Sequence, residues 1–394
     1  YINLSPAGSL ASSGSDMAKF MIAHLNNGAY GDRRILSEAT AREMHTTAAA
    51  TIGPLNRMLL GFYETNINGH RAIAHGGDTQ WFHSYLHLFP DDGIGLFVSV
   101  NSSGKEGAAG LVRTTLFEGF ADRYLPAAAV AGSAVDAETA KQHAQQLVGV
   151  YDNSRRAETT FLELVYLIGQ VKVNVNEDGT VSVTGLNNAA GEPKKYKETS
   201  PYVWRDVAGH DRIAAEVVDG RVMRFSADPF SGFMLFERAP WWKSSVWILP
   251  ALGLGLLVLL LTVLAWPVTA LIRRHYRLPA PLAIGDASVQ RRIRWAALVM
   301  LLVVVSAMGI IVSMLSDLDM VAAGMDWLVY TVRLTVAVVV PIATLFMLLN
   351  VAKVLRSAGR SRLAKFWALL LAVSCLFLLW LTVMFNIIGY SANY

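Results

Sequence analysis

The chain has 394 residues, of which 53% are hydrophobic and only 16% charged. Its formal charge of +4 does not indicate nucleic-acid binding, because much of the arginine lies beside long apolar runs. The single cysteine, Cys375, lies inside such a run, which excludes an internal disulfide and a cysteine-based metal site. Residues up to about 243 have a soluble composition, and those after them are dominated by apolar stretches.

The soluble part begins with a pattern of helices followed by strands. Ser13 is a typical N-cap, with Asp16 three residues later as in a capping box, and Ser37 starts a second helix. Alternating apolar residues then predict strands within residues 59–69, 70–77, 81–90 and 93–101. The turn PDDG joins the last two as a hairpin, and an amphipathic helix follows at 106–125. This order predicts an α+β fold in which the last helix covers one face of an antiparallel sheet.

These segments carry a resemblance to a known family. SPAGSLASSGSDMAKFMIAHLNNG, then IAHGGDTQWFHSYLHLFPDDGIGLFVSVN, then the closing helix resemble the C-terminal part of the β-lactamase-related serine hydrolases. That family includes class C β-lactamases, penicillin-binding proteins, D-amino peptidases and esterases. The resemblance covers about residues 4–125, and we assign residues 1–125 to part of such a domain.

The resemblance implies a site built from three motifs. In this family the serine of S-x-x-K attacks a carbonyl to form an acyl-enzyme, and its lysine and the tyrosine of Y-x-N move the proton. A third motif, K-T-G or H-x-G, lines the site from a strand, and His75-Gly76-Gly77 matches it. By resemblance, His75 and Gly77 are catalytic-site residues, Gly76 contacts substrate, and the Asp78 backbone N–H completes an oxyanion hole. The alternative is a strand end with a Gly-Gly turn and an ordinary histidine.

The other two motifs do not fit. Tyr1-Ile2-Asn3 spells Y-x-N, but it runs directly into the next segment and leaves no room for the chain that the family places between them. Ser102 has a lysine three residues later, Lys105, but it follows the His-Gly-Gly strand instead of preceding it. We therefore expect a fragment that lacks its N-terminal part and its nucleophile and is inert alone.

No metal or other cofactor is expected. His83 and His87 could share an ion if they stood four apart on a helix, but their segment alternates like a strand. On a strand they lie about 13 Å apart. One ion with bonds of about 2 Å cannot join them.

A second soluble segment follows. Residues 126–146 read as a small-residue linker and a short helix, and residues 147–240 as a small antiparallel barrel or sandwich. Strands are expected at 147–151, 159–168, 170–175, 180–185, 202–207, 212–218, 221–227 and 232–238. This segment resembles the lipocalin-like β domain that follows some hydrolases of the family. Packing or partner binding is its expected role.

Residues 246–388 contain four runs long enough to cross a bilayer, which needs roughly 20 apolar residues each. They cover about 246–272, 295–315, 327–350 and 366–388. The first and third connections are rich in Arg and Lys, whereas the second carries Asp317, Asp319 and Asp326. Because Lys and Arg stay on the cytoplasmic side, the soluble domains should face the periplasm or the cell exterior. The expected location is the cytoplasmic membrane, with the lipid bilayer as a partner.

Arg333 lies inside the third run, where an ionised group is costly. It either reaches outward and pairs with an outer aspartate or marks a polar site within the bundle. The segments lack the repeated broken helices and acidic relay of a transporter and read as an anchor.

Two functions remain open. The first is a membrane-anchored serine hydrolase acting outside the cytoplasm on D-amino peptides, peptidoglycan fragments, β-lactams or esters. The second is a non-catalytic protein that binds or senses a ligand with the hydrolase fold. The sequence does not identify the substrate.

Overall fold

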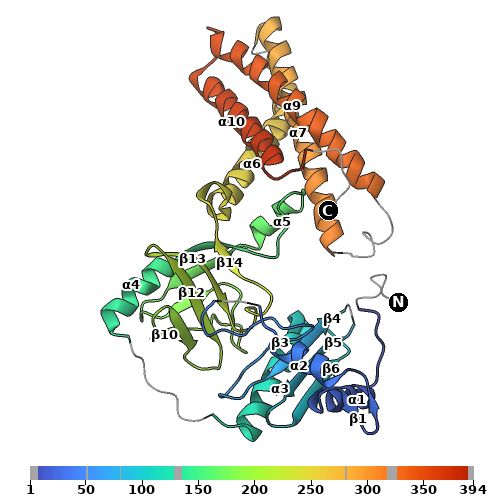
Figure 1. Ribbon diagram of the computed structural model, residues 1–394. Helices are drawn as coiled ribbons and strands as arrows, with labels where there is room; N and C mark the ends of the chain where they lie inside the picture. Colours follow the sequence, from blue (N-terminus) through green and yellow to red (C-terminus); the bar gives the residue numbers. More distant parts are fainter. Residues whose placement is uncertain are drawn as a thin grey trace. The chain divides into compact units, whose positions relative to one another are not determined.

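The computed structural model describes residues 8–49, 52–79, 81–127, 135–279, 282–316 and 326–388 (Figure 1). The chain forms two compact units, which are described separately. The first comprises Tyr1–Arg155 and Gly169–Ala239, and the second comprises Arg156–Ile168 and Pro240–Tyr394. The Tyr1-Ile2-Asn3 tripeptide lies outside the described residues.

The first unit begins with two capped helices. Helix α1 spans Gly14–Leu25, and the Ser13 hydroxyl accepts a hydrogen bond from the Asp16 backbone N–H at 3.2 Å and donates one to its carboxylate at 2.7 Å. Helix α2 spans Glu38–Thr46 and starts at Ser37, whose side chain accepts from the Thr40 N–H. Both predicted N-caps are confirmed. Between the helices, β1 (Ala29–Tyr30) pairs with β2 (Arg33–Arg34).

A four-stranded antiparallel sheet follows, in the order β3-β4-β5-β6. Its strands are β3 (Tyr63–Glu64), β4 (Ile73–Asp78), β5 (His83–Phe89) and β6 (Ile94–Val100). Met21 of α1 packs on one face, against Leu86 and Leu88. After the short turn η1 (Lys105–Gly107), helix α3 (Ala108–Tyr124) packs Phe117 on the other face, against Phe89. The predicted α+β arrangement is confirmed.

The remainder of the first unit is a closed barrel preceded by helix α4 (Ala137–Leu147). Its strands are β7 (Gly149–Asn153), β8 (Val171–Val175), β9 (Val181–Val183), β10 (Tyr196–Ser200), β11 (Val203–Asp206), β12 (Arg212–Val218), β13 (Arg221–Ala227) and β14 (Phe236–Arg238). Tyr151, Tyr196, Trp204 and Phe225 fill its core. The expectation of a small β barrel is confirmed.

One expected strand of this barrel is wrong. Residues 159–168 contain the short helix α5 (Glu163–Ile168), and Phe161 and Leu167 are buried in the core of the second unit. A short apolar run does not distinguish a strand from a buried helix, because either can hide it completely. The eighth barrel strand is instead β10, which was not predicted.

The second unit contains four helices long and apolar enough to cross a membrane. They are α6 (Ser245–Tyr276), α7 (Ile284–Ser316), α9 (Asp326–Arg356) and α10 (Arg362–Met384), and the turn η2 (Trp241–Lys243) precedes them. Each helix packs against two others, in the cyclic order α6, α7, α9, α10. The four predicted segments are confirmed, although α10 ends at Met384 and not at residue 388.

Arg333 is buried within α9. Its guanidinium donates to the carbonyl oxygens of Asn386, at 3.0 Å, and Ile387, at 3.3 Å, and lies 5.4 Å from the centre of the Phe161 ring. Both carbonyls follow the C-terminal end of α10, where the helix dipole favours a cation. This side chain therefore ties the residues that follow α10 to α9, about two turns from the start of that helix.

Candidate functional site

His75 is exposed on β4, in the strand that matches the third motif. Its Nδ1 lies 2.7 Å from the carbonyl oxygen of Gly61. Because a carbonyl oxygen can only accept, Nδ1 carries the proton of this hydrogen bond. In the neutral ring, Nε2 is then the nitrogen that can accept a hydrogen bond from another group.

Gly76 lies in a tight place, where a Cβ would crowd two tyrosine side chains. Its N–H donates to the Tyr63 hydroxyl at 2.8 Å. A Cβ at this position would lie 3.0 Å from the Tyr63 hydroxyl oxygen and 3.2 Å from Cδ2 of Tyr85. Burial raises the pKa of Tyr63, so its phenol stays protonated at neutral pH. The Tyr63 side chain therefore links β3 to β4 through the backbone N–H of Gly76.

Gly77 lies on the same face of the strand as His75, because side chains alternate along a strand. A Cβ built on Gly77 meets no described atom within 4 Å. Glycine is thus not required here by packing within the described residues. The missing side chain leaves the strand surface beside His75 open.

The direction of the Asp78 N–H follows from its neighbours. Thr79 N–H donates to the Phe82 carbonyl at 2.8 Å, toward β5, whereas Gly76 N–H points to the β3 side. Because N–H groups alternate along an antiparallel strand, Asp78 N–H points the same way as Gly76 N–H. The pairing of β3 with β4 stops at Ala74, so no described strand covers this edge beside Asp78.

The Asp78 carboxylate lies on the face of the sheet opposite to His75 and Gly77, and this face is covered by α3. Its Oδ1 accepts hydrogen bonds from Arg113 Nη2, at 2.7 Å, and from His83 Nδ1, at 2.6 Å. Arg113 also donates to the Ser84 carbonyl at 2.7 Å. The sequence did not indicate this cluster. The one feature that could have indicated it is Arg113, which lies in line with the buried residues Ala109 and Phe117 on α3.

His83 also reaches a serine. Its Nε2 lies 3.1 Å from the Ser103 hydroxyl, which gives the hydrogen-bond order Ser103, His83, Asp78 found in serine hydrolase triads. Here Asp78 Oδ1 also accepts a hydrogen bond from Arg113, so the carboxylate is shared between two partners. The cluster links the end of β4, the start of β5 and the loop before α3.

His87 lies on the same face of β5 but is fully buried. Its ring stacks on Phe117 with 3.8 Å between ring centres, and its Nδ1 lies 3.2 Å from the Thr65 hydroxyl. Burial lowers the pKa of His87 to about 3, and the positive charge of Arg113 contributes.

His83 and His87, the two histidines considered as metal ligands, thus have other contacts. No group of three or more His, Cys, Asp or Glu side chains in the described part of the chain could hold a metal ion.

Comparison with known proteins identifies the first part of the chain. Residues 1–118 match the model of the family described as Beta-lactamase. The N-terminal segment thus belongs to a beta-lactamase-related family, as the motif resemblance predicted. Among curated proteins, none matches the chain.

Solved structures give weaker similarities. The structure of SurE with D-Leu shares 15% identity at a TM-score of 0.32, over 58% of this chain and 50% of that one. The octameric penicillin-binding protein homologue from Pyrococcus abyssi shares 18% identity at a TM-score of 0.24, over 57% of this chain and 47% of that one. The chain thus spans about half the length of each.

Proposed function

We propose that this chain supplies one wall of the active site of a membrane-anchored serine hydrolase acting outside the cytoplasm. The observation that carries the proposal is the edge of β4. There His75 is exposed, Gly77 leaves open space, and the direction of the Asp78 N–H suits a donor to an oxyanion. The reaction would proceed through an acyl-serine, with a D-amino peptide, β-lactam or ester as substrate.

The nucleophile of this reaction would be a serine supplied from outside the printed sequence, because S-x-x-K and Y-x-N do not occur in usable positions within it. A substrate carbonyl would lie against β4, with its oxygen on the Asp78 N–H. His75 Nε2 would accept a hydrogen bond from substrate or from a neighbouring hydroxyl. The membrane helices would hold this site at the outer surface of the bilayer.

The proposed orientation rests on charge. Basic side chains gather at the ends of α6 and α9 and at the starts of α7 and α10: Arg273, Arg274, Arg291, Arg292, Arg294, Lys353, Arg356, Arg362 and Lys365. These ends would be cytoplasmic. A reporter fused after residue 394 should be active outside the cytoplasm, and one inserted near residue 282 should be active inside. The reverse pattern would overturn the orientation.

The catalytic part is tested in the longer protein that includes the preceding segment. Gly77→Val adds a branched side chain where no described atom lies within 4 Å, so the fold should persist while the substrate's path is blocked. Acyl-enzyme formation with a fluorescent penicillin, followed by mass spectrometry, should fall at least about tenfold. Ser99→Val is the matched control, on the exposed position of β6 in the same transverse row as Gly77 and Ser84.

Equal acylation by both variants would contradict the assignment of β4 as the substrate wall. Specific ligand binding without any acyl-enzyme in the longer protein would favour the second function, a non-catalytic receptor built on the hydrolase fold.

A further inference from the structure

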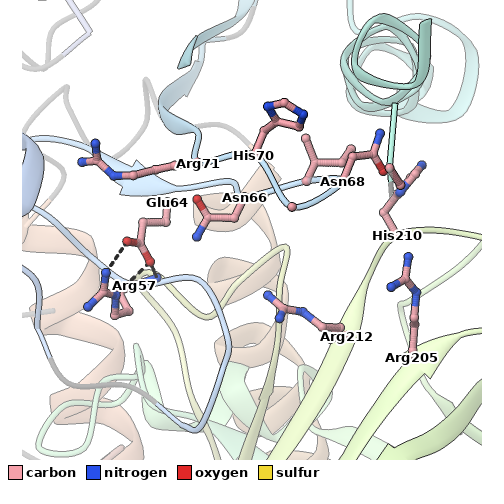
Figure 2. Close-up of a pocket in the computed structure, with 12 residues that line it drawn as sticks. Arg57, Glu64, Asn66, Asn68, His70, Arg71, Arg205, His210 and Arg212 are labelled. Atoms are coloured by element: carbon pink, nitrogen blue, oxygen red, sulfur yellow. Dashed lines mark hydrogen bonds and ion pairs between the residues drawn. The ribbon is translucent and has the colours of Figure 1, made fainter. Parts of the chain in front are cut away.

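Two clusters of charged side chains in the first unit differ in their relation to the proposed site. One lines a cavity of about 540 Å³ between the hairpin that joins β3 to β4 and the barrel strands β11 and β12 (Figure 2). Figure 2 shows Arg57 bound to Glu64 in its wall, with Nη2 to Oε1 at 2.6 Å and Nε to Oε2 at 2.9 Å. The lining of this cavity does not include any residue from 75 to 78. The other cluster, around Arg113 and Asp78, directly contacts the proposed substrate wall.

This second cluster surrounds the peptide group that joins Gly77 to Asp78. The N–H of this group is the donor assigned to the oxyanion, so any role of its surroundings in the reaction rests on the proposed function. A peptide group is planar and trans, and its C=O and N–H therefore point in opposite directions. Whatever holds the Gly77 carbonyl oxygen in place also sets the direction of the Asp78 N–H.

Arg113 contacts both this peptide group and the side chain that follows it. Its Nη1 donates to the carbonyl oxygens of Gly77, at 3.5 Å, and Ser84, at 2.7 Å, and its Nη2 donates to Asp78 Oδ1 at 2.7 Å. A guanidinium is planar and its donors form a fixed fork, so the two nitrogens cannot shift independently. One buried side chain thus holds the carbonyl oxygen on one side of the donor N–H and the carboxylate on the other.

This end of β4 lacks a neighbouring strand on the β3 side. The pairing of β3 with β4 stops at Ala74, and no described strand continues along the edge to which the Asp78 N–H points. A strand end with few partners opens more readily than a strand paired on both sides. An oxyanion donor, however, must stay about 2.7–3.1 Å from the position of the developing charge. Arg113 supplies the missing restraint from α3.

Packing alone does not require an arginine at this position. Arg113 lies in line with Ala109 and Phe117, which are buried on the same side of α3. An apolar side chain would fill the place without the cost of removing a guanidinium from water. The Tyr85 ring, whose centre is 5.7 Å from the guanidinium carbon, further restricts the arginine.

We propose that Arg113 is a positioning residue of the reaction, which keeps the Gly77–Asp78 peptide oriented so that its N–H meets the oxyanion. Because α3 covers the face of the sheet opposite to His75, Arg113 acts through this peptide and not on the substrate. Its hydrogen bond to the Gly77 carbonyl also polarises the peptide and strengthens the N–H as a donor. The benefit grows as charge develops on the substrate oxygen, so it belongs to the rate of acylation and not to substrate affinity.

The test uses the longer protein with its nucleophile and a fluorescent penicillin. Stopped-flow kinetics separate the dissociation constant, Kd, from the rate constant of acylation. Arg113→Lys keeps the charge but loses the fixed fork. Its acylation rate constant should fall at least about tenfold, less than the roughly 10²–10³ lost when a donor is removed outright. Its Kd should change less than about threefold.

Phe117→Leu is the matched control for a purely structural effect. Phe117 lies one turn further along α3 and stacks on His87, whose partner on β4 is Ala74 and not the end of the strand. This substitution should lower the Tm of the protein but leave the acylation rate constant of the folded protein unchanged. Arg113→Gln is a second variant, in case the lysine is not tolerated, and should show the same separation of rate from affinity.

Two results would overturn the role of Arg113 and leave the proposed function standing. One is an acylation rate constant equal to that of wild type in both arginine variants. The other is a fall of the same size in Phe117→Leu, because the loss would then follow stability. Absence of acylation in the folded wild-type protein would instead refute the proposed function, and this role with it.

Discussion

The Nδ1–H of His75 donates a hydrogen bond to the carbonyl oxygen of Gly61, 2.7 Å away. This contact fixes the ring on its strand and leaves Nε2 as the nitrogen that can accept a hydrogen bond in the neutral ring. The carbonyl partner carries no net charge, so this contact is a hydrogen bond and not an ion pair. A lysine at the same position would carry a full charge at neutral pH. The choice of residue at 75 therefore bears on which substrates the proposed site prefers.

The first prediction concerns substrate charge, in the longer protein with its nucleophile. Penicillins carry a carboxylate, whereas nitrophenyl esters are neutral. His75→Lys should raise the kcat/KM ratio for nitrocefin over ester roughly fivefold, the effect of one added exposed ion pair. His75→Ala should lower both values, because the hydrogen bonds of the ring are lost as well. An unchanged ratio in His75→Lys would refute the charge argument.

The second prediction concerns the chain of 394 residues by itself. It should take no covalent label from a fluorophosphonate or a fluorescent penicillin, because no serine has the S-x-x-K context in the required place. Ser103 is the sharpest check, since its hydroxyl lies 3.1 Å from His83 Nε2. Peptide mapping after labelling, with Ser103→Ala alongside, measures this directly. Stoichiometric label on Ser103 would show that the triad-like cluster is a working nucleophile.

Most of the barrel could be predicted from alternating apolar residues, but β10 could not. Its inward positions include Glu198, which is buried and accepts hydrogen bonds from His143 Nδ1 at 2.8 Å and from the Tyr202 N–H at 2.6 Å. A carboxylate at an inward position breaks the pattern on which strand prediction depends. Its partners lie 55 and 4 residues away, so the compensation is visible only in the folded chain.

The candidate site was partly predictable for a similar reason. His75-Gly76-Gly77 is a contiguous motif that can be read directly. The contacts of Gly61, Tyr63 and Arg113 come from other segments and depend on sheet register and helix packing. The Asp78 carboxylate lies on the face of β4 opposite His75 and Gly77, because side chains alternate along a strand, but its partners Arg113 and His83 come from other segments.

The third prediction concerns Arg113, which is buried and tied to Asp78 and to the Ser84 carbonyl. Arg113→Met keeps the length of the side chain but leaves the Ser84 carbonyl without its donor. We expect a loss of about 1–3 kcal/mol in the free energy of unfolding, seen as a lower Tm of the full chain in detergent. Arg123→Met, exposed on the same helix, is the control and should change little. Equal Tm values for the two variants would mean that the cluster does not stabilise the fold.

The last prediction concerns acid sensitivity. His87 is buried, and burial lowers its pKa to about 3, so the folded state keeps it neutral well below pH 6. In the unfolded chain an imidazole titrates at about 6.5. Between these values the unfolded state binds the extra proton, so stability falls as the pH drops from about 6.5 toward 3. At pH 5 this single group should cost about 2 kcal/mol relative to pH 8.

The buried pair His24 and His45, whose Nδ1 and Nε2 lie 3.0 Å apart, acts in the same direction, because burial lowers both pKa values. The Tm of the full chain should therefore fall between pH 7 and pH 5. His87→Gln, which retains a group able to bond the Thr65 hydroxyl, should reduce that fall, whereas His75→Gln, at an exposed ring, should not. If His87→Gln shows the same fall as wild type, His87 is not buried in its neutral form. A histidine signal in NMR that stays in the neutral form down to pH 5 would give the same information for the unmodified protein.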